Sequence, residues 1–233
     1  MIEQKLAVPR TGALLACGAV AGPLYIAVTA IQALTRDGFD PTQHRYNLLT
    51  TGDPGWIHRT NMVVAGVLMV LFAVGVGRML QGRGATWGPR LLGLYGVAYM
   101  VGGLFPADPV VGFPPGTLTE STTWHGMVNA GSRGTSSLLL IAASLVIARW
   151  FTGRGLRNWA WFSVAAVPLP LAAFALLTAA GTDKSTTYLA FLVPGILLWA
   201  WITALAIHLI RRAERHDAAP GAAGKGAPAS SMT

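Results

Sequence analysis

Charged residues are scarce in this chain. Only 11% of its 233 residues are Asp, Glu, Lys or Arg, whereas soluble domains carry about 25%. Hydrophobic residues make up 53% of the chain. This balance argues against a water-soluble domain and indicates one membrane-embedded domain.

The chain has a single cysteine and lacks several common catalytic and nucleotide-binding motifs. Cys17 is the only cysteine, which excludes an intrachain disulfide and a cysteine-based zinc cluster. The sequence has no Gly-x-Ser-x-Gly elbow, P-loop or dinucleotide fingerprint. The net charge of +8 does not indicate a nucleic-acid partner, because the basic residues are spread over short loops and form no basic helix.

Six long apolar segments are present, and none contains Asp or Glu. A bilayer core about 30 Å thick needs about 20 mostly apolar residues to cross it as a helix. The segments are about twice the length of a barrel strand and lack its alternation. The sequence therefore predicts an all-α, six-span transmembrane helical bundle over 12–34, 57–80, 88–105, 124–151, 159–180 and 188–210, with tails at 1–11 and 212–233, the second of them disordered.

Basic residues are distributed unequally between the two sides of this bundle. Lys and Arg collect on the cytoplasmic side of membrane proteins, so both termini are predicted to be cytoplasmic. The other side has four basic residues, Arg36, Arg45, Arg59 and Lys184. The predicted cytoplasmic side has twelve: Lys5, Arg10, Arg78, Arg83, Arg90, Arg149, Arg154, Arg157, Arg211, Arg212, Arg215 and Lys225.

The fourth segment carries a polar stripe. His125, Asn129 and Arg133 are spaced by four residues and so share one helix face. Polar groups in hydrocarbon need partners, so we expect this face to line a polar pocket under the outer loops. Arg133 is the key residue, because its partner must be a loop acid such as Asp108 or Glu120, backbone carbonyls, or an external anion.

The second segment adds polar residues at the same predicted end. His58, Arg59 and Asn61 lie near its start, and we expect them to face the stripe. His44, His58 and His125 are weak candidates for a zinc site, because no pair has the close helical spacing of a metal motif. We therefore expect no cofactor and no metal, with zinc kept as an alternative.

The loop and helix motifs resemble a known family. FPADP at 105–109, GFPPG at 112–116 and His125-Gly126, together with Gly55-Trp56 and Asn61, resemble a family of uncharacterised bacterial membrane proteins filed under a domain of unknown function, and actinobacterial members above all. The resemblance covers roughly Arg10 to Arg211. It implies a polytopic helical protein of the bacterial inner membrane, and it implies no activity.

Three functional hypotheses follow. The first is an outward-facing pocket that binds an anionic or amphiphilic small molecule or a lipid headgroup, lined by His58, Arg59, Asn61, His125, Asn129 and Arg133 with Asp108 and Glu120 on the covering loop. The second is a lipid hydrolase that uses Asp108 and His125 in catalysis. The third, a small transporter, is disfavoured because the sequence lacks an internal repeat and lacks ionisable residues through the cytoplasmic half.

Overall fold

The computed structural model describes residues 2–82, 85–181 and 184–218, and the side chains of 11–82, 85–181 and 192–215. These residues form a helical bundle, and the β pairing among them is one isolated bridge between Val110 and Phe113. The predicted all-α class is confirmed. The helices are α1 (Ile2–Thr35), the short 3-10 helix η1 (Tyr46–Thr50), α2 (Gly55–Met79), α3 (Trp87–Leu104), α4 (Trp124–Thr152), α5 (Arg157–Ala166), α6 (Pro168–Ala179) and α7 (Lys184–Ala218).

Length and composition make this a multi-pass membrane protein. Five helical stretches of the described chain are long and apolar enough to cross a bilayer, namely Thr11–Thr35, Gly55–Met79, Trp124–Thr152, Arg157–Ala179 and Leu192–Arg215. They coincide with five of the six expected spans. The remaining one corresponds to α3, which has 18 residues and packs against both α2 and α4. That α3 crosses the membrane stays a prediction.

Proline interrupts one expected span. The segment predicted at 159–180 consists of two helices, α5 and α6, which meet at Val167. Val167 leaves the helical conformation because the ring of Pro168 disfavours the α region for the preceding residue. Pro194 lies inside α7 without ending that helix.

The helices extend beyond the expected spans at both chain ends. α1 already includes residues 2–11, and α7 continues to Ala218. The predicted disordered tail is therefore helical over 212–218, which corrects that part of the prediction, and its remainder, 219–233, lies outside the described residues.

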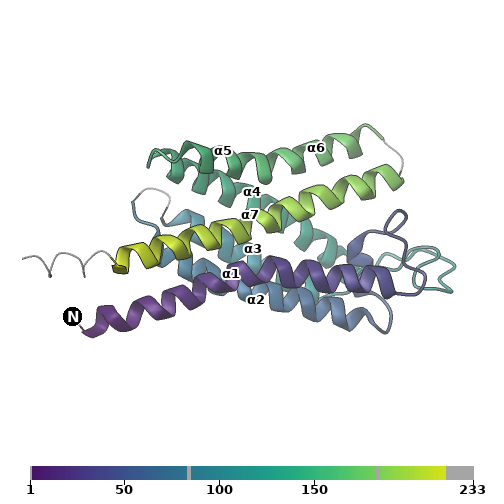
Figure 1. Ribbon diagram of the computed structural model, residues 1–233. Helices are drawn as coiled ribbons and strands as arrows, with labels where there is room; N and C mark the ends of the chain where they lie inside the picture. Colours follow the sequence, from purple (N-terminus) through teal and green to yellow (C-terminus); the bar gives the residue numbers. More distant parts are fainter. Residues whose placement is uncertain (1, 83–84, 182–183, 219–233) are drawn as a thin grey trace, which may run out of the picture.

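The start of α1 and the end of α7 lie at one end of the bundle. In Figure 1 the helices run side by side, with the start of α1 and the last turns of α7 on the left. The two long connections, 36–54 and 105–123, lie together on the right, where α1 ends and α4 begins. We refer to these as the terminal end and the loop end. All residues predicted to form the polar pocket belong to the loop end.

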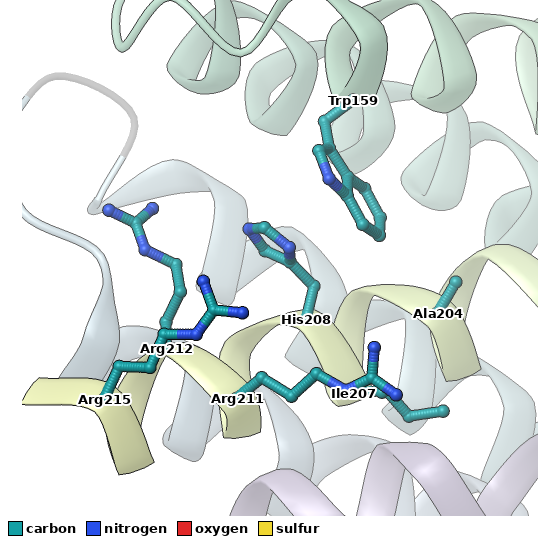
Figure 2. Close-up of a pocket in the computed structure, with 7 residues that line it drawn as sticks. All are labelled: Trp159, Ala204, Ile207, His208, Arg211, Arg212 and Arg215. Carbon is teal, nitrogen blue, oxygen red and sulfur yellow. The ribbon is translucent and has the colours of Figure 1, made fainter. Parts of the chain in front are cut away.

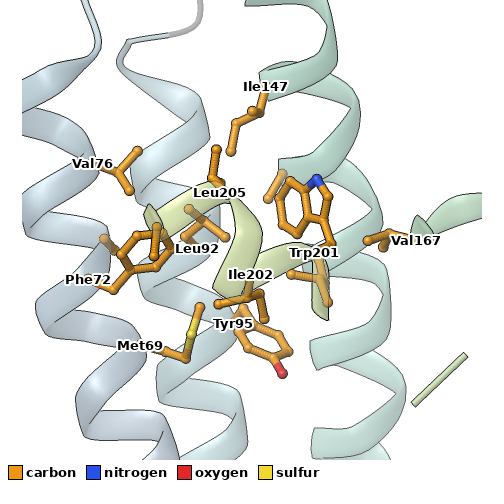
Figure 3. Packing of buried hydrophobic residues seen from close by; sticks show 14 of the residues in the cluster. Met69, Phe72, Val76, Leu92, Tyr95, Ile147, Val167, Trp201, Ile202 and Leu205 are labelled. Atoms are coloured by element: carbon orange, nitrogen blue, oxygen red, sulfur yellow. The ribbon is translucent and has the colours of Figure 1, made fainter. Parts of the chain in front are cut away.

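The core is formed by α7 inserted among the other helices. Met69 and Phe72 of α2, Leu92 of α3 and Trp201 of α7 are all at least 98% buried and belong to one continuous cluster (Figure 3). Trp201 also donates its indole N–H to the Ser163 hydroxyl at 3.0 Å, which satisfies a buried donor and joins α7 to α5.

Glycine sets the distance between α2 and α3. A Cβ at Gly96 would lie 2.7 Å from the Gly66 carbonyl oxygen, which is backbone and cannot rotate away. A Cβ at Gly93, one turn earlier in α3, would meet only the Ala73 side chain at an ordinary 3.7 Å. Small residues at such positions allow membrane helices to approach closely.

We expect Gly96→Ala to lower the free energy of unfolding by about 1–3 kcal/mol, because the added methyl forces the two helices apart. Unfolding in mixed detergent micelles, followed by circular dichroism, measures the change. Gly93→Ala is the matched control and should be neutral or slightly stabilising, since alanine is the better helix former. Equal stability of the two variants would contradict this account of the helix contact.

Candidate functional site

The two long connections pack on each other and form a cap over the loop end. Phe39 and Phe113 meet edge to face with ring centroids 5.5 Å apart, and both are at least 90% buried. The Ala107 amide donates to the Thr50 hydroxyl at 2.9 Å. Arg36 reaches across the same cluster, donating to the Leu49 carbonyl at 3.0 Å and to the Thr51 carbonyl. The connections are therefore ordered caps built around apolar side chains.

His44 belongs to this cap. Its ring lies 5.0 Å from that of Phe113, and its Nδ1 accepts the Asp40 amide at 3.0 Å. Burial lowers the pKa of His44, although the nearby Asp40 carboxylate acts weakly in the opposite direction. A neutral imidazole at pH 7 fits its role as an acceptor of the Asp40 N–H.

Asp108 caps the N-terminus of α4. Its carboxylate accepts the Thr123 amide at 3.0 Å and the Thr123 hydroxyl at 2.6 Å, and Thr123 in turn accepts the Gly126 amide at 3.2 Å. The carboxylate lies directly against Gly126, where a side chain would collide with it. A helix N-terminus favours a negative charge, so these contacts explain Asp108 without catalysis.

His125 faces aromatic rings instead of the acid proposed as its catalytic partner. It stacks on Trp124 with centroids 3.6 Å apart and lies 6.1 Å from the Phe105 ring. Within the described chain no ion pair joins His125 to Asp108, and Glu120 is exposed on the loop. The structure thus brings Asp108 and His125 to the same helix start without pairing them.

Asn129 joins three segments. Its side chain is fully buried, and its amide group donates to the carbonyls of Gly102 at 2.9 Å and Phe105 at 3.0 Å. Its oxygen accepts from Asn47 of η1 at 3.4 Å. Asn129 therefore holds the end of α3 and the cap to α4, with its donors already used.

His58 and Asn61 face α1, whereas we expected them to face the α4 stripe. Asn61 donates to the Tyr25 carbonyl at 3.1 Å and the Thr29 hydroxyl at 3.3 Å. His58 is 1% exposed, with its ring 5.8 Å from that of Tyr25. Arg59 lies on the α3 side of its helix, where its carbonyl approaches Gly103. The four-residue spacing predicted which polar residues share one face of α4. Nothing in the sequence showed which neighbouring helix His58, Arg59 and Asn61 of α2 would face.

The three candidate metal ligands lie in separate surroundings. Among the residues that the structure describes, no group of three His, Cys, Asp or Glu side chains could hold a metal ion. His44, His58 and His125 instead contact Phe113, Tyr25 and Trp124, respectively.

Like Arg59, whose buried Nε has no hydrogen-bond partner in the described structure, Arg133 has a charge without a partner among the described residues. It is half-buried two turns into α4, and its guanidinium donates no hydrogen bond and forms no ion pair within the described part of the chain. It lies within electrostatic range of Arg45 from the cap and of Tyr25 and Tyr99. Arg45 has the same sign, so it repels Arg133 instead of neutralising it.

An aromatic cluster beside Arg133 was not predicted from the sequence. Tyr25 of α1, Tyr95 and Tyr99 of α3 and Trp199 of α7 have ring centroids 5.1–5.7 Å apart along the contacts Tyr25–Trp199, Tyr25–Tyr99, Tyr95–Tyr99 and Tyr99–Trp199. The Tyr95 hydroxyl is buried without a partner in the described structure. Tyrosine normally collects at the membrane interface, so tyrosines in the middle of apolar segments were the available signal.

A hollow of about 390 Å³ also opens in the cap. It is lined by Thr51, Gly52, Pro106, Ala107, Pro109, Pro114 and Thr117. None of the predicted site residues lines it.

Comparison with known proteins places the chain in a family. The family described as "Protein of unknown function (DUF998)" matches residues 19–208, and the chain belongs to it. The expected membership of an uncharacterised family with a domain of unknown function is confirmed. Searches of curated proteins and of solved structures gave no match.

The capping role of Asp108 makes a prediction. Asp108→Ala should lower the free energy of unfolding by about 0.5–2 kcal/mol, because two donors at the start of α4 lose their acceptor. Thr123→Ala should cost a similar amount, and the double variant should cost less than the sum because the two residues share hydrogen bonds.

Thermal or denaturant unfolding of the four proteins measures this coupling. Asp53→Ala, which removes an exposed acid from the other connection, is the matched control and should leave stability unchanged within about 0.5 kcal/mol. Strictly additive losses would show that Asp108 and Thr123 do not act as one cap.

Proposed function

We propose that this family member binds an anionic amphiphile at the loop end of its membrane bundle and that Arg133 holds the anionic group. One observation carries the proposal: the Arg133 guanidinium, on a membrane-spanning helix, is half-buried and unpaired within the described residues. Intramembrane arginines that lack a structural partner mark functional sites by default.

The energetics favour an external partner. Placing an arginine at the centre of a membrane helix costs about 2.5–3.5 kcal/mol in translocon insertion. Arg45 adds repulsion to that cost. The two loop acids expected to offset it are used elsewhere or exposed, since Asp108 caps α4 and Glu120 lies on the loop surface. A bound anion would offset both the burial and the repulsion.

The surroundings of Arg133 suit an amphiphile. Guanidinium presents five donors in a planar fork that matches phosphate or carboxylate oxygens. Tyr25 and Tyr99 lie near it and pack with Trp199 in an aromatic cluster, so apolar side chains adjoin the charge. A fully hydrophilic anion would make no use of these apolar neighbours.

The same arrangement supports a location in the bacterial inner membrane, with the terminal end in the cytoplasm. Figure 1 places the start of α1, the α2–α3 and α4–α5 connections and the last turns of α7 together. These segments carry most of the basic residues, as the cytoplasmic side of a membrane protein does. The anion site would then open outward.

Reporter fusions test this orientation. Fusions after Arg154 and Arg215 should give a cytoplasmic signal, and a fusion at Gly116 should give an external signal. Identical signals from the Arg154 and Gly116 fusions would overturn the orientation, because these positions lie at opposite ends of the bundle.

Ligand-dependent thermal melts test the anion site. In a neutral maltoside detergent, dodecyl phosphate and dodecanoate should raise the melting temperature of the native protein, because a ligand that binds only the folded state stabilises it. Arg133→Gln should make that rise clearly smaller. Without ligand the variant should be as stable as the native protein or more so, since an unpaired buried charge has been removed.

Arg149→Gln is the matched control. It removes an exposed arginine from the opposite end of the same helix and should leave the ligand-dependent rise unchanged. If neither anion shifts the native melting temperature, or if Arg133→Gln destabilises the ligand-free protein by several kcal/mol, Arg133 has a structural partner and the proposal is wrong.

A further inference from the structure

A second basic site lies at the terminal end, on the other side of the bundle from Arg133. It is a cavity of about 500 Å³ between α5 and α7, lined by Trp159, Ala204, Ile207, His208, Arg211, Arg212 and Arg215. In Figure 2 the Trp159 indole points from α5 toward His208, and the three arginine side chains leave α7 beside it. We call it the arginine pocket.

The arginine pocket has three positive charges and no acid in its lining. Arg211, Arg212 and Arg215 fall within five consecutive residues of α7 and so crowd one stretch of the helix. Glu214 is exposed between them, yet no ion pair joins it to these arginines in the described structure. Such a concentration of unneutralised positive charge attracts a polyvalent anion.

His208 lines the arginine pocket and carries a polar ring nitrogen that is available to a ligand. Its Nε2 is buried and has no hydrogen-bond partner in the part of the chain that is described. The ring is held by Trp159, with centroids 4.3 Å apart, and by Phe151 at 5.6 Å. A buried polar atom without a partner is uncommon in folded proteins, and a ligand oxygen reaching the pocket floor would satisfy it.

The lining is half apolar, which suits a lipid better than a free ion. Ala204, Ile207 and the Trp159 indole form one part of the wall, and the arginines form the other. The arginines also lie where the membrane-spanning stretch Leu192–Arg215 ends, the level at which lipid headgroups are found. A phosphate at the arginines would therefore leave an attached acyl chain free to run along the apolar wall.

We propose that the arginine pocket binds the phosphate of an anionic lipid headgroup, with Arg211, Arg212 and Arg215 holding the phosphate and His208 contacting one of its oxygens. Basic pockets between membrane helices at the cytoplasmic face recognise such headgroups. The pocket shares no residue with the Arg133 site, so this proposal does not depend on anion binding there; it takes from the subsection above only the cytoplasmic placement of this end.

Lipid titration of the purified protein in neutral maltoside detergent tests it. Phosphatidylglycerol and cardiolipin should bind and raise the melting temperature, whereas phosphatidylcholine should not. The triple variant Arg211→Gln/Arg212→Gln/Arg215→Gln should bind phosphatidylglycerol about a hundredfold more weakly, because each basic residue near an anionic lipid contributes roughly a fivefold factor. Arg211→Gln and Arg215→Gln alone should each weaken binding about fivefold, and they serve if the triple variant does not fold.

A second triple variant, Arg78→Gln/Arg90→Gln/Arg149→Gln, is the matched control. It removes the same charge from exposed positions at the same end, outside the arginine pocket, and should change affinity less than about threefold. Equal losses in the two triple variants would overturn the proposal in favour of general surface attraction. Inorganic phosphate that stabilises the protein as well as phosphatidylglycerol does would overturn it in favour of a soluble phosphate compound.

Discussion

Hydrocarbon offers no water to polar groups, and this one constraint explains the structure from its helices to its candidate sites. Backbone N–H and C=O groups must be satisfied within each segment, so every long apolar run becomes a helix. Polar side chains inside the bundle need partners as well, and most find them on neighbouring helices. Asn61 bonds α1, Asn129 bonds the end of α3, and Ser163 accepts from Trp201 of α7. Polar side chains that have no such partner need another explanation.

The helical class and helix positions could be predicted because they depend on local composition. Twenty apolar residues make a span whatever packs beside them. The break at Val167 was equally local, since Pro168 causes it, but a proline in a membrane helix can be tolerated, as Pro194 is in α7. The spans were therefore predictable from the sequence, but which proline would divide a span was not.

The candidate site was predicted only in part, because periodicity defines the face of a helix and not its neighbour. Asn129 and Arg133 do face inward, yet Asn129 has all its donors satisfied by the fold, whereas Arg133 has none. Asp108 is held by Thr123 and packs on Gly126, a contact formed across fifteen residues of loop. No helical spacing connects such residues, so an acid that caps a helix and an acid that acts in catalysis looked alike in the sequence.

The arginines of the two proposed sites differ in burial, and burial separates their physical roles. At the end of α7, the side chains of Arg211, Arg212 and Arg215 are exposed, and an exposed charge costs little without a ligand. Arg133 is half-buried in the membrane-spanning stretch of α4, within electrostatic range of Tyr25, Tyr99 and Arg45. Removing the terminal arginines should therefore change lipid affinity more than stability. At Arg133, by contrast, a charge without a ligand burdens the fold, which makes Arg133 a stronger indicator of function than the arginines at the end of α7.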